Sequence, residues 1–263
     1  MIVWTTPAVE PTRYTRQEHP FHFKVSRSAL GTLLALCIAT PAIGQVSLGS
    51  AQSFAVLGGS TITNTGSTAI TGDVGVSPGS AITGFPPGVV TGGTLHAADA
   101  TASQAQTDLN IAYGAAAGAA CTTSLTGQDL GGLTLTPGVY CFSSSAALTG
   151  TLTLNLQGNP NAFFLIQIAS TLTTASLSSV VLSNTGGPAC APNLFWQVGS
   201  SATLGSNSSF QGSILALTSI TMTTSAQLSG NALAENGAVT LDTNAISVCN
   251  VLTPVTLQEF SVD

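Results

Sequence analysis

The sequence contains very little charge. Only 5% of its 263 residues are Asp, Glu, Lys or Arg, and the four basic residues all lie in the first 27 positions: Arg13, Arg16, Lys24 and Arg27. A chain without Lys or Arg beyond that point cannot neutralise phosphates, which excludes nucleic-acid binding. Phosphate-bearing cofactors are disfavoured for the same reason, and no glycine-rich phosphate loop follows a strand. We therefore expect no cofactor.

Catalytic side chains are equally scarce. His96 is the only histidine after the N-terminal region, and we expect it at the exposed start of a helix. No G-x-S-x-G sequence supplies a nucleophile for it. Asp73, Asp129, Glu235 and Asp242 are scattered along the chain, with no carboxylate pair suited to glycoside cleavage. The sequence predicts a protein that is not an enzyme.

The N-terminal region has the features of an export signal. The basic residues precede a 12-residue apolar run at 29–40, and the small residues Ala42-Ile43-Gly44 follow. This order is typical of a secretory signal peptide, and the run is too short to span a membrane comfortably. We predict a signal peptide over 1–44 and a secreted, extracellular mature chain without membrane contact. An uncleaved N-terminal anchor is the alternative.

Four cysteines remain after that segment: Cys121, Cys141, Cys190 and Cys249. An even set in an exported chain predicts disulfides, and four cysteines allow three pairings. Cys121–Cys141 with Cys190–Cys249 is favoured, because each bridge would then close a separate part of the chain. A zinc site is the alternative, but no CxxC or histidine-containing cluster supports it, and we expect no metal.

Three segments near the C-terminus superimpose on one another. They begin at Ser201 (SATLGSNSSFQGSILA), Ser219 (SITMTTSAQLSGNALA) and Gly237 (GAVTLDTNAISV). A period near 18 residues, with Gly, Ser and Asn between short apolar stretches, predicts a β-solenoid with about three strands per coil and a triangular section. We assign 45–250 to this single domain and 251–263 to a short tail, either a linker remnant or an end cap.

Alternation within each short strand separates inward from outward residues. Apolar residues such as Ile220 and Met222 would fill the core, and threonines between or beside such residues would face out. The twelve candidate threonines are Thr61, Thr63, Thr65, Thr68, Thr151, Thr153, Thr171, Thr173, Thr203, Thr221, Thr223 and Thr240. Exposed threonine is common on strands and needs no function. A repeated, uncharged threonine array would nevertheless suit a repetitive flat surface, since β-branched side chains are stiff.

One stretch departs from the repeat. Residues 96–118 are rich in Ala and Gln, lack proline, and predict a helix that Thr94 would cap. An apolar stripe at helical spacing would pack on the solenoid: Ala98, Ala102, Ala105, Leu109, Ala112 and Ala116. The covered side would consist of 162–168, 194–198, 213–217 and 231–234, which are apolar on both faces.

Four long motifs resemble the secreted ice-binding proteins of the DUF3494 family. They are TGDVGVSPGSAITGFPPG (71–88), DLGGLTLTPGVY (129–140), NPNAFFLIQIASTL (159–172) and the stretch 193–222. The resemblance runs from about Leu48 to Val248. It implies a discontinuous right-handed β-solenoid of triangular cross-section with one long helix alongside, hence an all-β-dominated fold.

The resemblance also implies a function. Members of that family adsorb to ice through a flat solenoid face, inhibit ice recrystallisation and depress freezing non-colligatively. Some carry a T-A/G-x-T/N pattern, which 65–68 (TGST) and 68–71 (TAIT) fit, whereas 206–209 and 224–227 depart from it. The expected partner is an ice crystal surface, bound by a monomer through the twelve candidate threonines.

Several alternatives stay open at this point. The next side of the coil could bind ice instead, through Thr71, Ser178, Gln211, Ser229 and Ser247. A solenoid adhesin or polysaccharide-binding module could use the same threonines on a polymer. A β-helix carbohydrate-active enzyme is a third class, disfavoured by the missing basic residues and carboxylate pairs.

Overall fold

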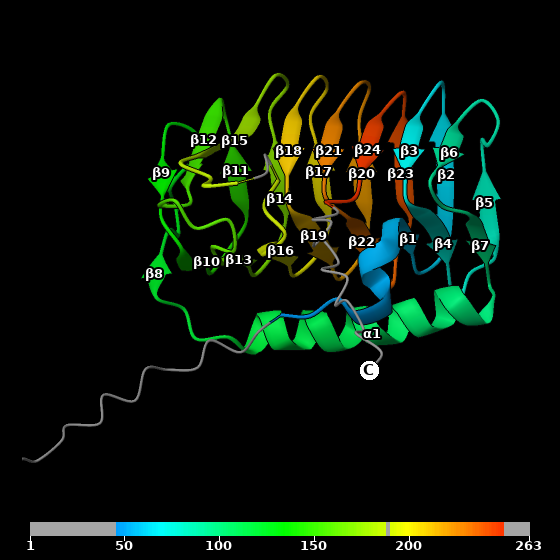
Figure 1. Ribbon diagram of the computed structural model, residues 1–263, viewed down its shortest axis with the longest axis horizontal. Helices are drawn as coiled ribbons and strands as arrows, with labels where there is room; N and C mark the ends of the chain where they lie inside the picture. Colours follow the sequence, from blue (N-terminus) through cyan, green and yellow to red (C-terminus); the bar gives the residue numbers. More distant parts are fainter. Residues whose placement is uncertain (1–45, 188–189, 250–263) are drawn as a thin grey trace, which may run out of the picture. The chain divides into compact units, whose positions relative to one another are not determined.

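The computed structural model describes residues 46–187 and 190–249, which form three parallel β-sheets and one long helix (Figure 1). The predicted signal peptide (1–44) and tail (251–263) lie outside the described residues. A short 3-10 helix, η1 (Gly49–Ser53), precedes the first strand. Within the described residues, no helix is long and apolar enough to cross a membrane.

Each sheet stacks strands from successive coils, with at most one strand from any coil. Sheet A has the order β7 (Leu95–Ala97), β4 (Asp73–Val76), β1 (Phe54–Gly58), β22 (Ala232–Ala234), β19 (Ser213–Ala216), β16 (Leu194–Val198), β13 (Phe164–Ile168), β10 (Gly138–Phe142) and β8 (Thr123–Ser124). Sheet B has the order β11 (Ala146–Leu148), β14 (Leu172–Thr174), β17 (Ala202–Leu204), β20 (Ile220–Met222), β23 (Val239–Asp242), β2 (Thr61–Thr65) and β5 (Ala81–Thr83). Sheet C has the order β6 (Val89–Thr91), β3 (Ala69–Thr71), β24 (Ala245–Ser247), β21 (Gln227–Ser229), β18 (Ser209–Gln211), β15 (Ser179–Ser183), β12 (Thr151–Asn155) and β9 (Thr134–Leu135).

The solenoid is discontinuous in sequence. Strand β1 pairs with β22, β2 with β23 and β3 with β24, so the first coil of the chain docks on the last. After β7, at one edge of sheet A, the helix leads the chain to β8 at the opposite edge (Figure 1). The expected β-solenoid with one helix alongside is confirmed.

The core forms from the alternation within the strands. Ile220 and Met222 are fully buried on either side of the outward Thr221, and the neighbouring coils repeat this with Ala202 and Leu204 and with Val239 and Leu241. Glycine repeats at the corner between sheets C and A, because the coils approach closely there. A Cβ on Gly230 would lie 2.1 Å from the carbonyl oxygen of Gly212, and Gly230 has a φ of +149°.

Helix α1 (Ala100–Gly118) begins four residues later than the predicted start. Residues 95–97 instead pair with β4 as β7, and Asp99 rather than Thr94 caps the helix by accepting a hydrogen bond from the Ala102 N–H. The prediction failed because both residue types cap helices well, and pairing of 95–97 with β4 cannot be foreseen from local sequence. Ala98 lies before the helix and is exposed, whereas the other five residues of the predicted stripe are buried.

The helix covers sheet A, as expected. Its buried face packs with Leu165 of β13, Phe195 of β16, Leu215 of β19 and Leu233 of β22, all of which lie in the four segments predicted for the covered side. Polar contacts fix its ends. Gln167 donates to the carbonyls of Ala116 and Ala119 at the C-terminal end, both at 2.8 Å, which satisfies backbone acceptors left free there.

The favoured disulfide pairing is confirmed. Cys121 is bonded to Cys141, which ties the segment after α1 to β10, and Cys190 is bonded to Cys249. Because sheet A lies under the helix, only sheets B and C remain as broad faces that a surface or polymer could reach.

Candidate functional site

Sheet B presents an outward row in which six threonines follow one another. The pairing register places Thr173 beside Thr203, then Thr221, Thr240, Thr63 and Thr83, with Ala147 at the β11 end. We call these six threonines the threonine row. They come from six adjacent strands of a parallel sheet, so successive members are spaced by about 4.8 Å.

Sequence analysis found five members of the row and missed Thr83. Residues 81–83 (AIT) repeat the letters of 69–71 (AIT), which belong to sheet C. Only the register, Ile62 opposite Ile82 and Thr63 opposite Thr83, assigns the second copy to sheet B.

The side chains of the row are held rigidly. Each of Thr203, Thr221 and Thr240 lies between two buried apolar neighbours on its own strand, and its strand is paired on both sides. Thr203 and Thr221 are half-buried, and Thr63, Thr83, Thr173 and Thr240 are exposed. Since the χ1 of threonine is stiff, methyls and hydroxyls are displayed in a fixed array.

Four other candidates border the row. Thr171 donates to the Ser145 hydroxyl at 2.8 Å, and Thr223 donates to the Leu204 carbonyl at 2.8 Å. Thr61 pairs with Ala81, and Thr65 pairs with Asp242. These positions widen the hydroxyl-bearing surface on both sides of the row.

Two acidic residues lie at the edges of this face, Asp242 beside Thr65 and Asp129 beside Ala147 at the β11 end. The Asp242 carboxylate accepts hydrogen bonds from the Thr224 and Thr243 hydroxyls at the adjacent corner. The threonine row itself carries no charge.

Three candidate threonines do not belong to this face. Thr68 is only 1% exposed, and its hydroxyl accepts from the Asn244 N–H at 3.0 Å, so it cannot touch an external surface. Thr151 and Thr153 lie in β12 of sheet C, opposite Ser179 and Val181. Alternation identified them as strand residues, but sheets B and C share that alternation, and β11 already supplies the sheet B strand of their coil.

The alternative face is real but lacks one predicted member. Thr71, Ser247, Ser229 and Gln211 align across β3, β24, β21 and β18 of sheet C. Ser178 is 1% exposed and donates to the Ala175 carbonyl at 2.7 Å, so it is part of the corner.

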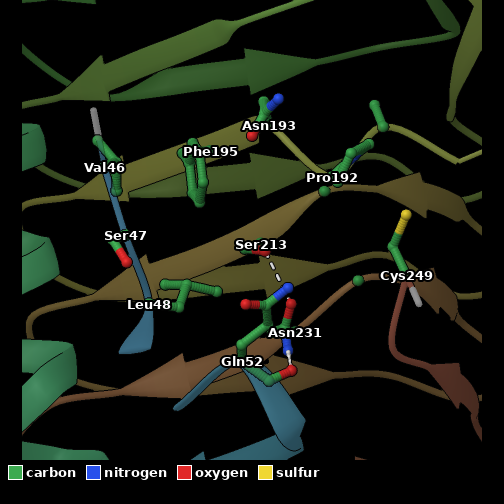
Figure 2. Close-up of a pocket in the computed structure, with 13 residues that line it drawn as sticks. Val46, Ser47, Leu48, Gln52, Pro192, Asn193, Phe195, Ser213, Asn231 and Cys249 are labelled. Carbon is green, nitrogen blue, oxygen red and sulfur yellow. Dashed lines mark hydrogen bonds between the residues drawn. The ribbon is translucent and has the colours of Figure 1, made fainter. Parts of the chain in front are cut away.

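A partly open cavity of about 290 Å³ lies between residues 46–52 and the corner of sheets C and A (Figure 2). The polar side chains of Ser213 and Asn231 in its wall form hydrogen bonds within the protein. Ser213 donates to Asn231 at 2.8 Å, and Asn231 donates to the Phe54 carbonyl at 2.7 Å. None of its lining residues is an acid or a base, and its one cysteine, Cys249, is in a disulfide. This cavity offers no catalytic chemistry.

His96 has a structural environment. It lies in β7 rather than at the helix start, with Nδ1 2.7 Å from Asp99 Oδ2 and Nε2 2.8 Å from Thr94 Oγ1. It thereby links the helix cap to the end of sheet A. The lone histidine of the described residues is engaged in holding these elements together.

A family model described as ice-binding-like matches residues 56–247. The chain belongs to the ice-binding-like family. An ice-binding protein of Nostoc sp. (strain HG1) is 59% identical over 201 residues, which cover 76% of this chain and 73% of the relative. An ice-binding protein of Flavobacterium frigoris is 38% identical over 218 residues, covering 77% and 76% of the two chains.

Solved ice-binding protein structures have the same fold. One from an Antarctic biological consortium matches with a TM-score of 0.73 at 50% identity, covering 77% of this chain and 90% of the other. One from the ascomycete Antarctomyces psychrotrophicus matches with a TM-score of 0.74 at 42% identity, covering 78% and 99%. The resemblance noted from the four sequence motifs is therefore confirmed, and ice-binding family membership bears out the prediction that the chain is not an enzyme.

Proposed function

We propose that this protein adsorbs to ice crystals through the threonine row of sheet B, and so inhibits ice growth and recrystallisation. The observation that carries the proposal is the register of the row, which repeats one rigid side chain on six adjacent strands. The names of the relatives, ice-binding proteins from a cyanobacterium, bacteria and fungi, support the target.

The physical basis is a match between two repetitive surfaces. Methyls and hydroxyls at fixed spacing hold neighbouring water in an ordered layer, whereas mobile charged side chains such as Lys and Glu would disrupt that order. Each contact is weak, but contacts displayed on one rigid scaffold act together at high effective concentration. A bound protein then blocks the addition of water molecules to the crystal beneath it.

Sheet B suits this role better than the other two sheets. Helix α1 covers sheet A. Sheet C mixes Ala, Ser, Thr and Gln on its outward positions, so its side chains end at different heights. A rigid crystal plane needs an even surface, and the side chains of one length in the threonine row provide it.

We infer that the protein acts outside the cell as a monomer. Two disulfides among the described residues support an oxidising compartment, and the sequence of residues 1–44 supports export. One solenoid displays the whole row, so adsorption does not require a second copy. Size-exclusion chromatography with light scattering checks the monomer, and N-terminal sequencing of the secreted chain checks cleavage near Gln45.

The function is tested on the chain lacking residues 1–44. In an ice-affinity partition, the protein should enter slowly growing ice, and in a recrystallisation assay it should keep ice grains small. Its reduced and unfolded form serves as the matched control and should remain in the liquid. Exclusion of the folded protein from ice would overturn the proposal.

A further inference from the structure

Sheet C carries a second surface feature that ice adsorption does not use. Two outward rows cross β18, β21, β24 and β3. One contains Ser209, Gln227, Ala245 and Ala69, and the other contains Gln211, Ser229, Ser247 and Thr71. Between them lies a hollow of about 300 Å³. Because both rows run across the strands, the hollow follows the solenoid axis for roughly 15 Å, three strand spacings.

Side-chain length produces the hollow. Gln211 stands beside the short Ser229 on the adjacent strand, and Gln227 stands beside Ser209 and Ala245. The positions between the two rows are Phe210, Leu228 and Ile246, whose side chains point into the core and leave only backbone at the floor. Long amides on a background of Ser and Ala therefore rim a shallow groove.

The groove is polar and uncharged, and one of its polar atoms lacks a hydrogen-bond partner among the described residues. Its outward lining consists of amides, hydroxyls and alanine methyls, without an acid or a base. Gln211 Oε1 is buried and has no hydrogen-bond partner among the described residues. A buried acceptor without a partner is costly, so rotation of the Gln211 amide towards the groove, where a ligand can donate to its oxygen, would be favourable.

The backbone beneath this position is well anchored. The Trp196 indole N–H donates to the Gln211 carbonyl at 2.9 Å, and the ring packs against Phe210 with a centroid distance of 4.7 Å. Gln211 is thus presented from a fixed strand, and a ligand that binds it does not have to order the backbone.

We propose that this sheet C groove binds an extended, uncharged polysaccharide chain. A rigid crystal plane cannot enter the hollow between the two rows, whereas a single polymer strand can. Sugar hydroxyls both donate and accept, which matches the amides of Gln211 and Gln227 and the hydroxyls of Ser229 and Ser247. The coil spacing of about 4.8 Å allows about one pyranose ring per coil along the groove.

This site lies on a different sheet from the threonine row. One molecule could therefore hold a polysaccharide matrix and an ice surface together, and the two activities are separable by mutation.

The test is native gel electrophoresis with and without hydroxyethyl cellulose in the gel, repeated with the anionic polymer alginate. The neutral polymer should retard the wild-type chain, and alginate should not. Ser229→Tyr fills the hollow and Gln211→Ala removes the unpartnered acceptor. Each should weaken binding by about tenfold, the scale of one lost hydrogen-bonded group. Thr221→Tyr, on sheet B, is the matched control and should migrate like the wild type.

Three results would overturn the proposal: no retardation of the wild type by hydroxyethyl cellulose, equal retardation by alginate, or unchanged retardation of Ser229→Tyr. Circular dichroism verifies the fold of each variant, and Ser247→Tyr replaces Ser229→Tyr if that chain does not fold. An ice-affinity partition on the same proteins separates the two proposals, since loss of ice adsorption alone contradicts only the role of sheet B.

Discussion

Thr221 shows at the scale of one residue why threonine suits the row. Buried Ile220 and Met222 fix its strand on both sides, and Thr203 and Thr240 stand beside it in register. Serine would keep the hydroxyl but lose both the methyl and the restricted χ1 of a β-branched side chain.

Replacing Thr203, Thr221 and Thr240 together by serine tests this reasoning. We expect the variant to need about tenfold more protein to stop recrystallisation, because weak contacts on one surface act multiplicatively. Grain size against protein concentration is the measurement. The control variant has serine at Thr71 and Thr91 of sheet C. It should stop recrystallisation at the same protein concentration as the wild type. A triple variant as potent as the wild type would show that the methyls contribute nothing.

For Thr68 we predict an effect on stability and none on ice adsorption. Its buried hydroxyl accepts from the Asn244 N–H, so Thr68→Val leaves a buried donor unsatisfied and should lower the free energy of unfolding by about 1–3 kcal/mol. Urea denaturation measures this loss. Ice adsorption per folded molecule should be unchanged, and a selective loss of adsorption with full stability would place Thr68 back on the binding face.

Single residues also show how far sequence patterns reach. Alternation correctly separated inward from outward positions at Ile220, Thr221 and Met222, because strand geometry alone sets that period. It could not tell Thr151 of sheet C from Thr173 of sheet B, because both sheets alternate in the same way. Assigning a side of the coil requires the register between coils, which is a tertiary property.

At the scale of the element, helix α1 is held by two aspartates. Asp99 caps its N-terminus, and the hydrogen bond from the Ala102 N–H, with help from His96, lowers the pKa of that carboxyl. Asp108 accepts from the hydroxyl and the N–H of Ser50, which lowers its pKa too and ties η1 to the helix.

These two lowered pKa values predict acid sensitivity. Both carboxylates stabilise the folded state at pH values above their ordinary pKa, and this contribution is lost as the pH falls below about 4 toward the lowered values. The effect should be small because both groups are exposed to solvent screening. Thermal unfolding midpoints between pH 7 and pH 2.5 measure it.

Asp99→Asn with Asp108→Asn is the matched control, because asparagine still caps a helix but does not titrate. The double variant should show a shallower fall of the midpoint with acid than the wild type. An identical fall in both chains would contradict the role assigned to these two aspartates.

The sequence predicts the packing face of the helix correctly but not the residue at which the helix begins. The buried residues Ala102, Ala105, Leu109, Ala112 and Ala116 follow from helical periodicity. The start at Ala100 depends on β7 pairing with β4, a contact between strands separated by about 20 residues, and no local signal reports it.

At the scale of the whole molecule, the order of the coils could not be worked out from the repeats. Docking of β1 on β22 joins segments far apart in the chain. The repeat period does not indicate which coils are neighbours. The discontinuity was available only through the resemblance to a known family. The disulfide pairing, by contrast, followed from the simple expectation that each bridge closes a separate part of the chain.

The two bridges should differ in their contribution to stability. Their cysteines are 20 and 59 residues apart, and the cost of closing a loop in the unfolded chain grows slowly with its length. Cys121→Ser with Cys141→Ser should lower the free energy of unfolding by about 3 kcal/mol. Cys190→Ser with Cys249→Ser should lower it by about 4 kcal/mol, because its loop is longer. Urea denaturation of both variants measures the order, and a reversed order would contradict this account.

The central claim is that sheet B meets ice, and one pair of variants tests it directly. Thr221→Tyr places a bulky ring in the middle of the threonine row, and Ser229→Tyr places the same ring on sheet C. The fraction of each folded protein incorporated into slowly growing ice is measured beside the wild type. We predict a fall of about tenfold or more for Thr221→Tyr and no change for Ser229→Tyr, since one raised residue lifts the whole row off a rigid plane. Full incorporation of Thr221→Tyr together with exclusion of Ser229→Tyr would move the ice-binding face to sheet C.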